Sequence, residues 1–224
     1  MTGLTVILRK EVKNLLNSGW GIFFVYALIS VIWSFMLFYS KGGDMEIWMI
    51  FFAVIVAANF SGTVFISERV NGTLEVLIVS GVTRDAVLFG KVIFVAGATM
   101  IMGGVCVAMS ACWVFWFDGL DKTVLWAEWW ARRGALLYLG ATALNVSASA
   151  YLSVRMGNPR FLHFANLFMT GVLAAAYRVI MFIFGYYQAI LITFILVFLA
   201  PAAVFSILAR REFAGERITR PVIF

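Results

Sequence analysis

The sequence is poor in charged residues, cysteine and histidine, and each scarcity excludes a class of protein. Only 12% of its 224 residues are charged, which is about half the share that a soluble domain carries. Cys106 and Cys112 lie in one apolar run, where six helical residues rise about 9 Å and turn past half a circle, so they cannot form a disulfide. They are expected to be buried thiols. His163 is the single histidine, and one histidine supports neither a metal site nor a catalytic triad.

Nucleotide-binding motifs are also missing from the sequence. Gly90 and Lys91 are followed by Val92, and Asp85 stands where a P-loop needs its first glycine. The chain is therefore not expected to hydrolyse ATP, to act as an enzyme by itself or to carry a cofactor or metal. No close pair of carboxylates indicates acid–base catalysis either.

Apolar residues are abundant and make up 63% of the chain, with a mean hydropathy of +0.99. This composition predicts an all-α polytopic membrane protein with a single transmembrane domain over residues 1–224. The formal net charge is +6, but the cations lie at the ends of the apolar runs. Because that placement is typical of the positive-inside rule, membrane orientation explains the charge and no nucleic-acid partner is expected.

Apolar runs of roughly 20 residues predict six transmembrane helices. Their ranges are 20–39, 47–66, 87–117, 134–152, 161–177 and 188–208. Arg178 interrupts the apolar pattern after the fifth range. The residues from there to Tyr187 fit either a continuation of the helix or a re-entrant arm.

Residues 2–18 predict an amphipathic helix before the first span. Apolar residues recur there at helical spacing, whereas Arg9, Lys10 and Lys13 fall on other faces. A helix of this kind lies in the membrane interface with its cationic side toward lipid phosphates. An ordinary cytosolic lead-in is the alternative.

Six spans would place both termini on one side of the membrane. Most lysine and arginine residues, Lys91 among them, then fall on that side and identify it as the cytoplasm. We therefore expect a multi-pass protein of the cell membrane with both termini cytoplasmic. On the opposite side, residues 113–130 hold five of the eight tryptophans. An interfacial belt with a short helix is expected there, and an aromatic ligand cage is the alternative.

The segment 67–86 is the most polar internal stretch, and its charges cannot lie in hydrocarbon. Asn71, Gly72 and Thr73 are residues that start helices or turns, and a short apolar run follows them. Thr83 can cap a further helix that has Asp85 in its first turn. The pattern predicts a short helix between the second and third spans, whose apolar side needs a partner surface.

Residues 68–91 follow the pattern Glu-Arg, Gly-Thr-Leu-Glu, an apolar pair, a break, Thr-Arg and Gly-Lys. This pattern resembles the type-2 ABC exporter permeases. The matching positions are Glu68, Arg69, Gly72, Thr73, Leu74, Glu75, Leu77, Arg84, Gly90 and Lys91. The family usually has a proline after the apolar pair, where this chain has Ser80 and Gly81, and a glycine can make the same break.

The resemblance implies a cytosolic coupling helix that docks on a separate ABC ATPase subunit. The residues implied in this contact are Glu68, Arg69, Asn71, Gly72, Thr73, Leu74, Glu75, Leu77 and Ile78. It also implies that the ATPase binds ATP and Mg²⁺, that the interfacial helix adjoins the ATPase, and that a second permease subunit completes a homodimer. If the chain is such a permease, its apolar and aromatic spans favour a hydrophobic, lipid-like or peptide cargo.

Polar residues inside the predicted spans are candidates for the transport pathway. They are Asn59, Asn145, Asn166 and His163. Polar groups at membrane depth usually face protein or a wet path, and interhelical hydrogen bonding is the alternative to substrate contact. Asn145, Ser149 and Ser153 repeat every four residues, so this side of the fourth span is expected to face protein.

Two other functions fit the same pattern of spans. A haem-exporter-like permease of cytochrome c maturation is similar in length and layout. A membrane assembly protein without a transport cycle belongs to a different class and would not need an ATPase. Co-purification of an ATPase would separate the transporters from the assembly protein.

Overall fold

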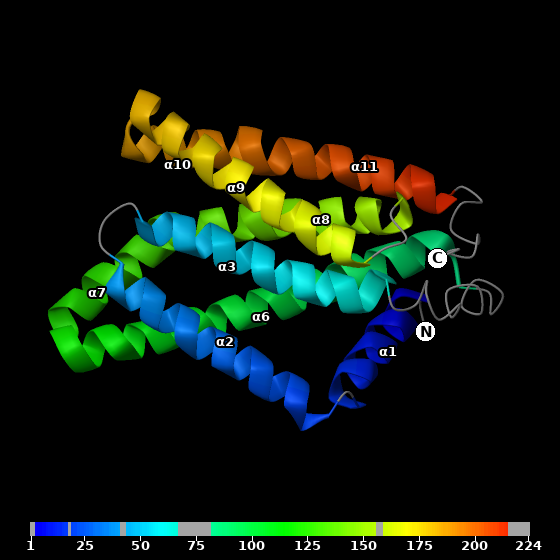
Figure 1. Cartoon of the computed structure of the whole chain (residues 1–224), viewed down its shortest axis with the longest axis horizontal. Helices are drawn as coiled ribbons and strands as arrows, with labels where there is room; N and C mark the ends of the chain where they lie inside the picture. The colour runs from blue at the N-terminus through cyan, green and yellow to red at the C-terminus, as the bar shows by residue number, and fades with distance from the viewer. Residues whose placement is uncertain (1–2, 18, 41–43, 67–81, 156–158, 215–224) are drawn as a thin grey trace.

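The computed structural model describes residues 3–17, 19–40, 44–66, 82–155 and 159–214, and within these ranges it contains helices and no strand. The all-α prediction is therefore confirmed for the described residues. The helices form an elongated bundle with α1 at one end and α7 at the other (Figure 1). We refer to these as the α1 end and the α7 end. The elements are α1 (Gly3–Asn17), α2 (Trp20–Tyr39), α3 (Asp44–Ser61), η1 (Gly62–Ile66), α6 (Arg84–Asp118), α7 (Leu120–Trp129), η2 (Trp130–Gly134), α8 (Ala135–Arg155), α9 (Pro159–Phe184), α10 (Tyr186–Ile192), η3 (Thr193–Leu199) and α11 (Ala200–Ala214), where η marks a π-helix.

Five helical stretches are long and apolar enough to cross a membrane, which identifies a multi-pass membrane protein. They are Met45–Phe65, Arg84–Asp118, Leu120–Arg155, Phe164–Phe184 and Ala189–Glu212. The apolar stretch in α2, Phe23–Tyr39, is shorter. The count of six spans stays a prediction.

The polar start of α6 follows the local pattern that the sequence predicts. Thr83 is the N-cap, and its side chain accepts a hydrogen bond of 3.3 Å from the backbone N–H of Ala86. Asp85 lies in the first turn, where a carboxylate suits the helix dipole. The helix then runs for 35 residues, or about 52 Å, and exceeds the roughly 30 Å of membrane hydrocarbon. It ends at Asp118, and the next residue, Gly119, has a φ of +89°, which favours glycine.

The fifth helix departs from its predicted end. α9 continues through Arg178 to Phe184 instead of stopping at Tyr177, so residues 179–184 are its last turns and not a separate arm. The Arg178 side chain is exposed, and a charge that points away from the bundle does not break a helix. Gly185, with a φ of +74°, makes the turn into α10.

The helix α8 lies at the centre of the hydrophobic core. Ala141, Asn145, Ser149 and Ser153 are all buried, which confirms that this side of the helix faces protein. Tyr138 donates a hydrogen bond of 2.6 Å to the carbonyl of Thr99 on α6. This hydrogen bond joins α8 to α6 across the core.

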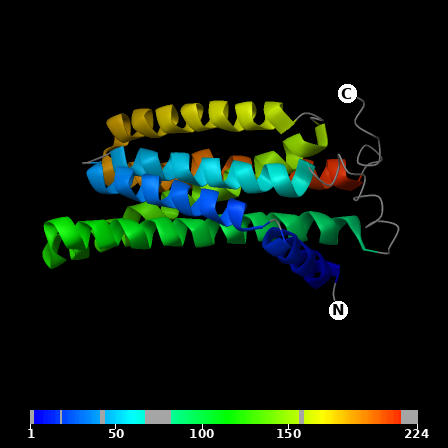
Figure 2. The same cartoon turned by 60° about the horizontal axis from the view of Figure 1, so that its bottom comes forward.

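The helix α1 packs against the first turns of α6 (Figure 2). Ile7 is fully buried there, and a Cβ added to Gly90 would lie 2.7 Å from its Cγ2 atom. Glu11, one turn further along α1, is also buried, whereas Leu16 is exposed. The inner side of α1 is thus held by the bundle, and its membrane-interface role remains a prediction.

Candidate functional site: a buried lysine beside the polar segment

The predicted coupling residues lie in the range 67–81, outside the described residues. They are Glu68, Arg69, Asn71, Gly72, Thr73, Leu74, Glu75, Leu77 and Ile78. The helices on either side of this range are described, since η1 ends at Ile66 and α6 begins at Arg84. The candidate site is therefore built from these flanking helices and from α1.

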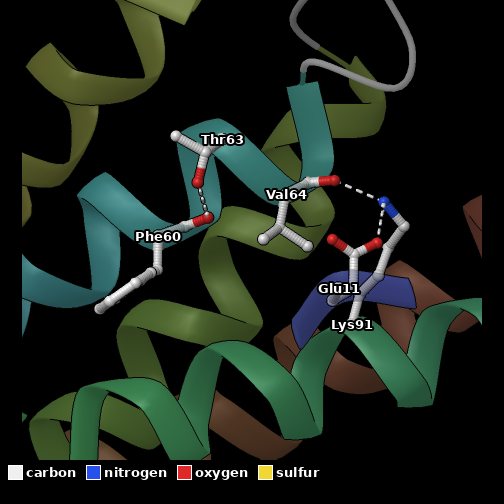
Figure 3. Close-up of polar contacts among 5 residues, drawn as sticks. All are labelled: Glu11, Phe60, Thr63, Val64 and Lys91. Atoms are coloured by element: carbon white, nitrogen blue, oxygen red, sulfur yellow. Dashed lines mark hydrogen bonds and ion pairs between the residues drawn. The ribbon is translucent and has the colours of Figure 1, made fainter. Parts of the chain in front are cut away.

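Lys91 is the centre of the polar contacts at this end of the bundle (Figure 3). It is fully buried on α6, and its Nζ donates a hydrogen bond to the backbone carbonyl of Val64 on η1. The same Nζ lies 3.9 Å from Oε1 of Glu11 on α1, whose side chain is 5% exposed. Nζ also lies 5.7 Å from the centre of the Phe65 ring. One ammonium group thus joins α1, η1 and α6.

The chemistry of Lys91 suits both of its oxygen partners. The Val64 carbonyl lies on η1, and its oxygen accepts one of the three N–H donors of the ammonium group. The Glu11 carboxylate supplies the opposite charge that a buried ammonium needs. Because breaking a buried pair from one side costs about 3 to 5 kcal/mol, the three elements are expected to move together.

Two further ion pairs, each with an exposed arginine, link α11 to α6 and α8. Arg210 Nη2 lies 3.0 Å from Oδ2 of Asp85, and Arg155 Nη2 lies 3.3 Å from Oε1 of Glu212. They bring the end of α11 beside the start of α6 and the end of α8. Exposed pairs contribute about 1 kcal/mol or less, so they align these ends more than they stabilise them.

Lys91, which the sequence counts among the cations of the cytoplasmic side, is buried within the bundle. Sequence reasoning also missed Glu11. The signal was present, because Glu11 follows Ile7 by four residues and so shares its buried face of α1. An acidic residue on the apolar side of a helix needs a cationic partner, and Lys91 supplies it.

Two of the predicted pathway residues meet in a second polar cluster between α8 and α9. Ser149 Oγ lies 3.5 Å from Oδ1 of Asn145 and 3.4 Å from Oδ1 of Asn166, and Asn166 Nδ2 donates to Ser149 Oγ at 3.2 Å. All three side chains are buried. Asn145 Nδ2 has no hydrogen-bond partner among the described residues. The cluster therefore joins the two helices and retains one unused donor.

The other two pathway candidates do not join this cluster. Asn59 is half-buried on α3, and its Nδ2 donates at 2.9 Å to the carbonyl of Ile55 in its own helix. The side chain of His163 lies outside the described part of the structure. The side-chain amide of Asn59 therefore has a hydrogen-bond partner within its own helix.

An apolar groove of about 600 Å³ lies between α1, α2 and α6. Its lining includes Leu8, Tyr26, Ser30 and Ile101, and almost all of the lining surface is apolar. The Ser30 hydroxyl is buried without a partner among the described residues. A groove of this size and character suits a hydrocarbon chain.

Comparisons with protein-family models, with curated proteins and with solved structures find no match for this chain. Within the described residues, no group of three or more His, Cys, Asp and Glu side chains could hold a metal ion. A function for the chain therefore rests on the pattern over residues 68–91 and on the contacts around Lys91.

Proposed function

We propose that the chain is the transmembrane permease subunit of a type-2 ABC exporter, with residues 71–79 forming the coupling helix on a separate ATPase subunit. The observation that supports this most directly is the position of Lys91. It joins η1 and α6, the two helices that flank the polar segment, and it also contacts α1. A force applied to the segment would therefore reach three elements at once.

In the proposed cycle, the ATPase subunits bind ATP and Mg²⁺ and close, which pushes the coupling helices of two permease copies together. The flanking α3 and α6 then tilt and switch access between the two sides of the membrane. The full permease would have six spans, both termini in the cytoplasm of the cell membrane, and a homodimeric pathway. The apolar groove beside α1 supports a lipid-like or other hydrophobic cargo.

The direct test is recovery of the ATPase with the permease in mild detergent. We expect Glu75→Arg combined with Leu77→Asp to abolish this recovery while membrane insertion is retained, because charge and apolar contact are both lost. The control is Asp121→Arg with Val124→Asp on α7, where both side chains are exposed at the opposite end. Equal recovery of the ATPase with both double variants would reject the coupling role.

Recovery of the wild-type chain without any ATPase would instead favour an assembly protein that has no transport cycle.

A further inference from the structure

A second cavity, of about 450 Å³, lies at the α7 end, away from the Lys91 site. It is open to the surface and is lined by the ends of α2, α3 and α6 that meet there, together with α7 and η2. Its charged lining residues are Glu46, Asp118, Lys122 and Arg133, two of each sign. Lys122 Nζ lies 3.8 Å from Asp118 Oδ1, so these two charges already neutralise each other. A lining without net charge favours a zwitterion over a simple anion or cation.

Glu46 supplies an unused acceptor in this cavity. The residue is 1% exposed, and its Oε1 accepts a hydrogen bond of 3.1 Å from Nε1 of Trp129. Its Oε2 is buried and has no hydrogen-bond partner among the described residues. A buried carboxylate oxygen without a partner is costly, so a donor on a bound ligand would be strongly favoured.

Trp126 supplies an unused donor in the same cavity. It is 7% exposed, and its indole N–H has no partner among the described residues. By contrast, the indole groups of Trp33, Trp113 and Trp129 each donate to a carbonyl, hydroxyl or carboxylate oxygen. Trp126 therefore differs from tryptophans that serve only as packed or anchored side chains.

The two unused groups define the chemistry of a ligand. An ammonium group can donate to Glu46 Oε2 in a charge-assisted hydrogen bond, and it can also lie against an indole ring. The rings of Trp126 and Trp129 have centroids 6.0 Å apart and are tilted by 48°. An acceptor oxygen on the same ligand can take the Trp126 N–H.

We propose that this cavity binds a compact ammonium compound that carries an acceptor oxygen, of the phosphoethanolamine type. The ammonium meets Glu46 and the oxygen meets Trp126. Such a group can come from a lipid headgroup or from a soluble amine. The proposal is independent of the ATPase, because it uses residues at the opposite end of the bundle.

The test uses the full chain in detergent with phosphatidylethanolamine, phosphatidylcholine or soluble O-phosphoethanolamine. Native mass spectrometry counts the bound lipid molecules. The rise in melting temperature measures binding of the soluble probe. Choline has no N–H donor, so we expect the ethanolamine lipid to bind about tenfold more tightly than the choline lipid if the source is lipid. A response to O-phosphoethanolamine with no headgroup preference would identify a soluble ligand.

Matched variants separate the cavity from general lipid binding. Glu46→Gln and Trp126→Phe are expected to weaken binding about tenfold or more, because the first removes the charge from a side chain of the same shape and the second removes the indole N–H while keeping an aromatic ring. Glu128→Gln and Trp116→Phe are the controls, since both residues are exposed. Gel filtration checks folding, and Trp126→Phe decides the outcome if Glu46→Gln does not fold. Binding of neither ethanolamine probe, or equal binding by cavity and control variants, would overturn the proposal and leave water as the occupant.

Discussion

Lys91 and Glu11 face each other from α6 and α1 with Nζ and Oε1 3.9 Å apart, and both side chains are almost completely removed from solvent. The pair lies about 10 Å along α6 from its first residue, Arg84. It is therefore close to the polar segment that precedes α6. If residues 67–81 lie in the cytosol as proposed, the pair lies near that face of the membrane and not at its centre, unlike the buried charges expected of an ion-coupled transporter.

Removal of one partner from this pair should be more harmful than removal of both. We expect Lys91→Met to cost about 3 to 5 kcal/mol, because the buried Glu11 carboxylate loses its cation. The double variant Lys91→Met with Glu11→Leu should recover most of that loss. Denaturant titration in mild detergent measures the free energies of unfolding.

The control for this cycle is Lys122→Met, which removes an exposed pair with Asp118 and should cost less than about 1 kcal/mol. Strictly additive effects of the Lys91 and Glu11 substitutions would show that the two side chains are not coupled.

The contact between α1 and α6 should be sensitive to a single methyl group. Gly90→Ala is expected to cost about 1 to 3 kcal/mol, because its Cβ would clash with Ile7. Gly97→Ala on the same helix has nothing within 4 Å and should be neutral or stabilising by up to about 1 kcal/mol. Thermal unfolding followed by circular dichroism compares the two variants. If Gly90→Ala proved as stable as Gly97→Ala, the close packing of α1 on α6 would be wrong.

The cluster between α8 and α9 should contribute to stability, whereas Asn59 should not. Asn166→Ala removes the hydrogen bonds to Ser149 and is expected to cost about 1 kcal/mol. Asn59→Ala removes only a bond within α3 and should have little effect. The same unfolding assay measures both. A transport defect without a loss of stability in Asn166→Ala would instead indicate substrate contact.

The sidedness of the polar segment can be tested by thiol labelling in a variant with Cys106→Ala and Cys112→Ser. We expect a cysteine at Asn71 to react with a membrane-impermeant reagent only from the cytosol. Asp121→Cys on α7 is the control and should react only from outside, because it lies at the opposite end of the bundle. Labelling of position 71 from outside would overturn the orientation and the proposed coupling role.

Much of the helical layout could be predicted because it depends on local sequence. The apolar run over 20–39 coincides with α2, and Thr83 with Asp85 marks the start of α6 through capping chemistry. The buried side of α8 followed from the regular spacing of Asn145, Ser149 and Ser153. An apolar run, a capping residue and a four-residue spacing can all be recognised from residues that are close together in the sequence.

The missed features depend on partners that are distant in the sequence. Nothing local to Glu11 or Glu46 shows that Lys91 or Trp129 will reach it. The continuation of α9 past Arg178 likewise depends on which side of the helix faces the bundle. Five predicted spans could therefore be placed approximately, but neither the Lys91 site nor the cavity beside Glu46 could be assembled from spacing alone.

The length of α6 has a mechanical consequence. If this 35-residue rod rocks by about 5° around Arg84, Lys91 shifts by only about 1 Å, whereas Asp118 sweeps through about 4 to 5 Å. The ammonium can keep its oxygen partners during such a swing. The wall of the cavity beside Glu46 cannot keep its shape, so a modest rotation near one membrane face is magnified into a rearrangement at the other.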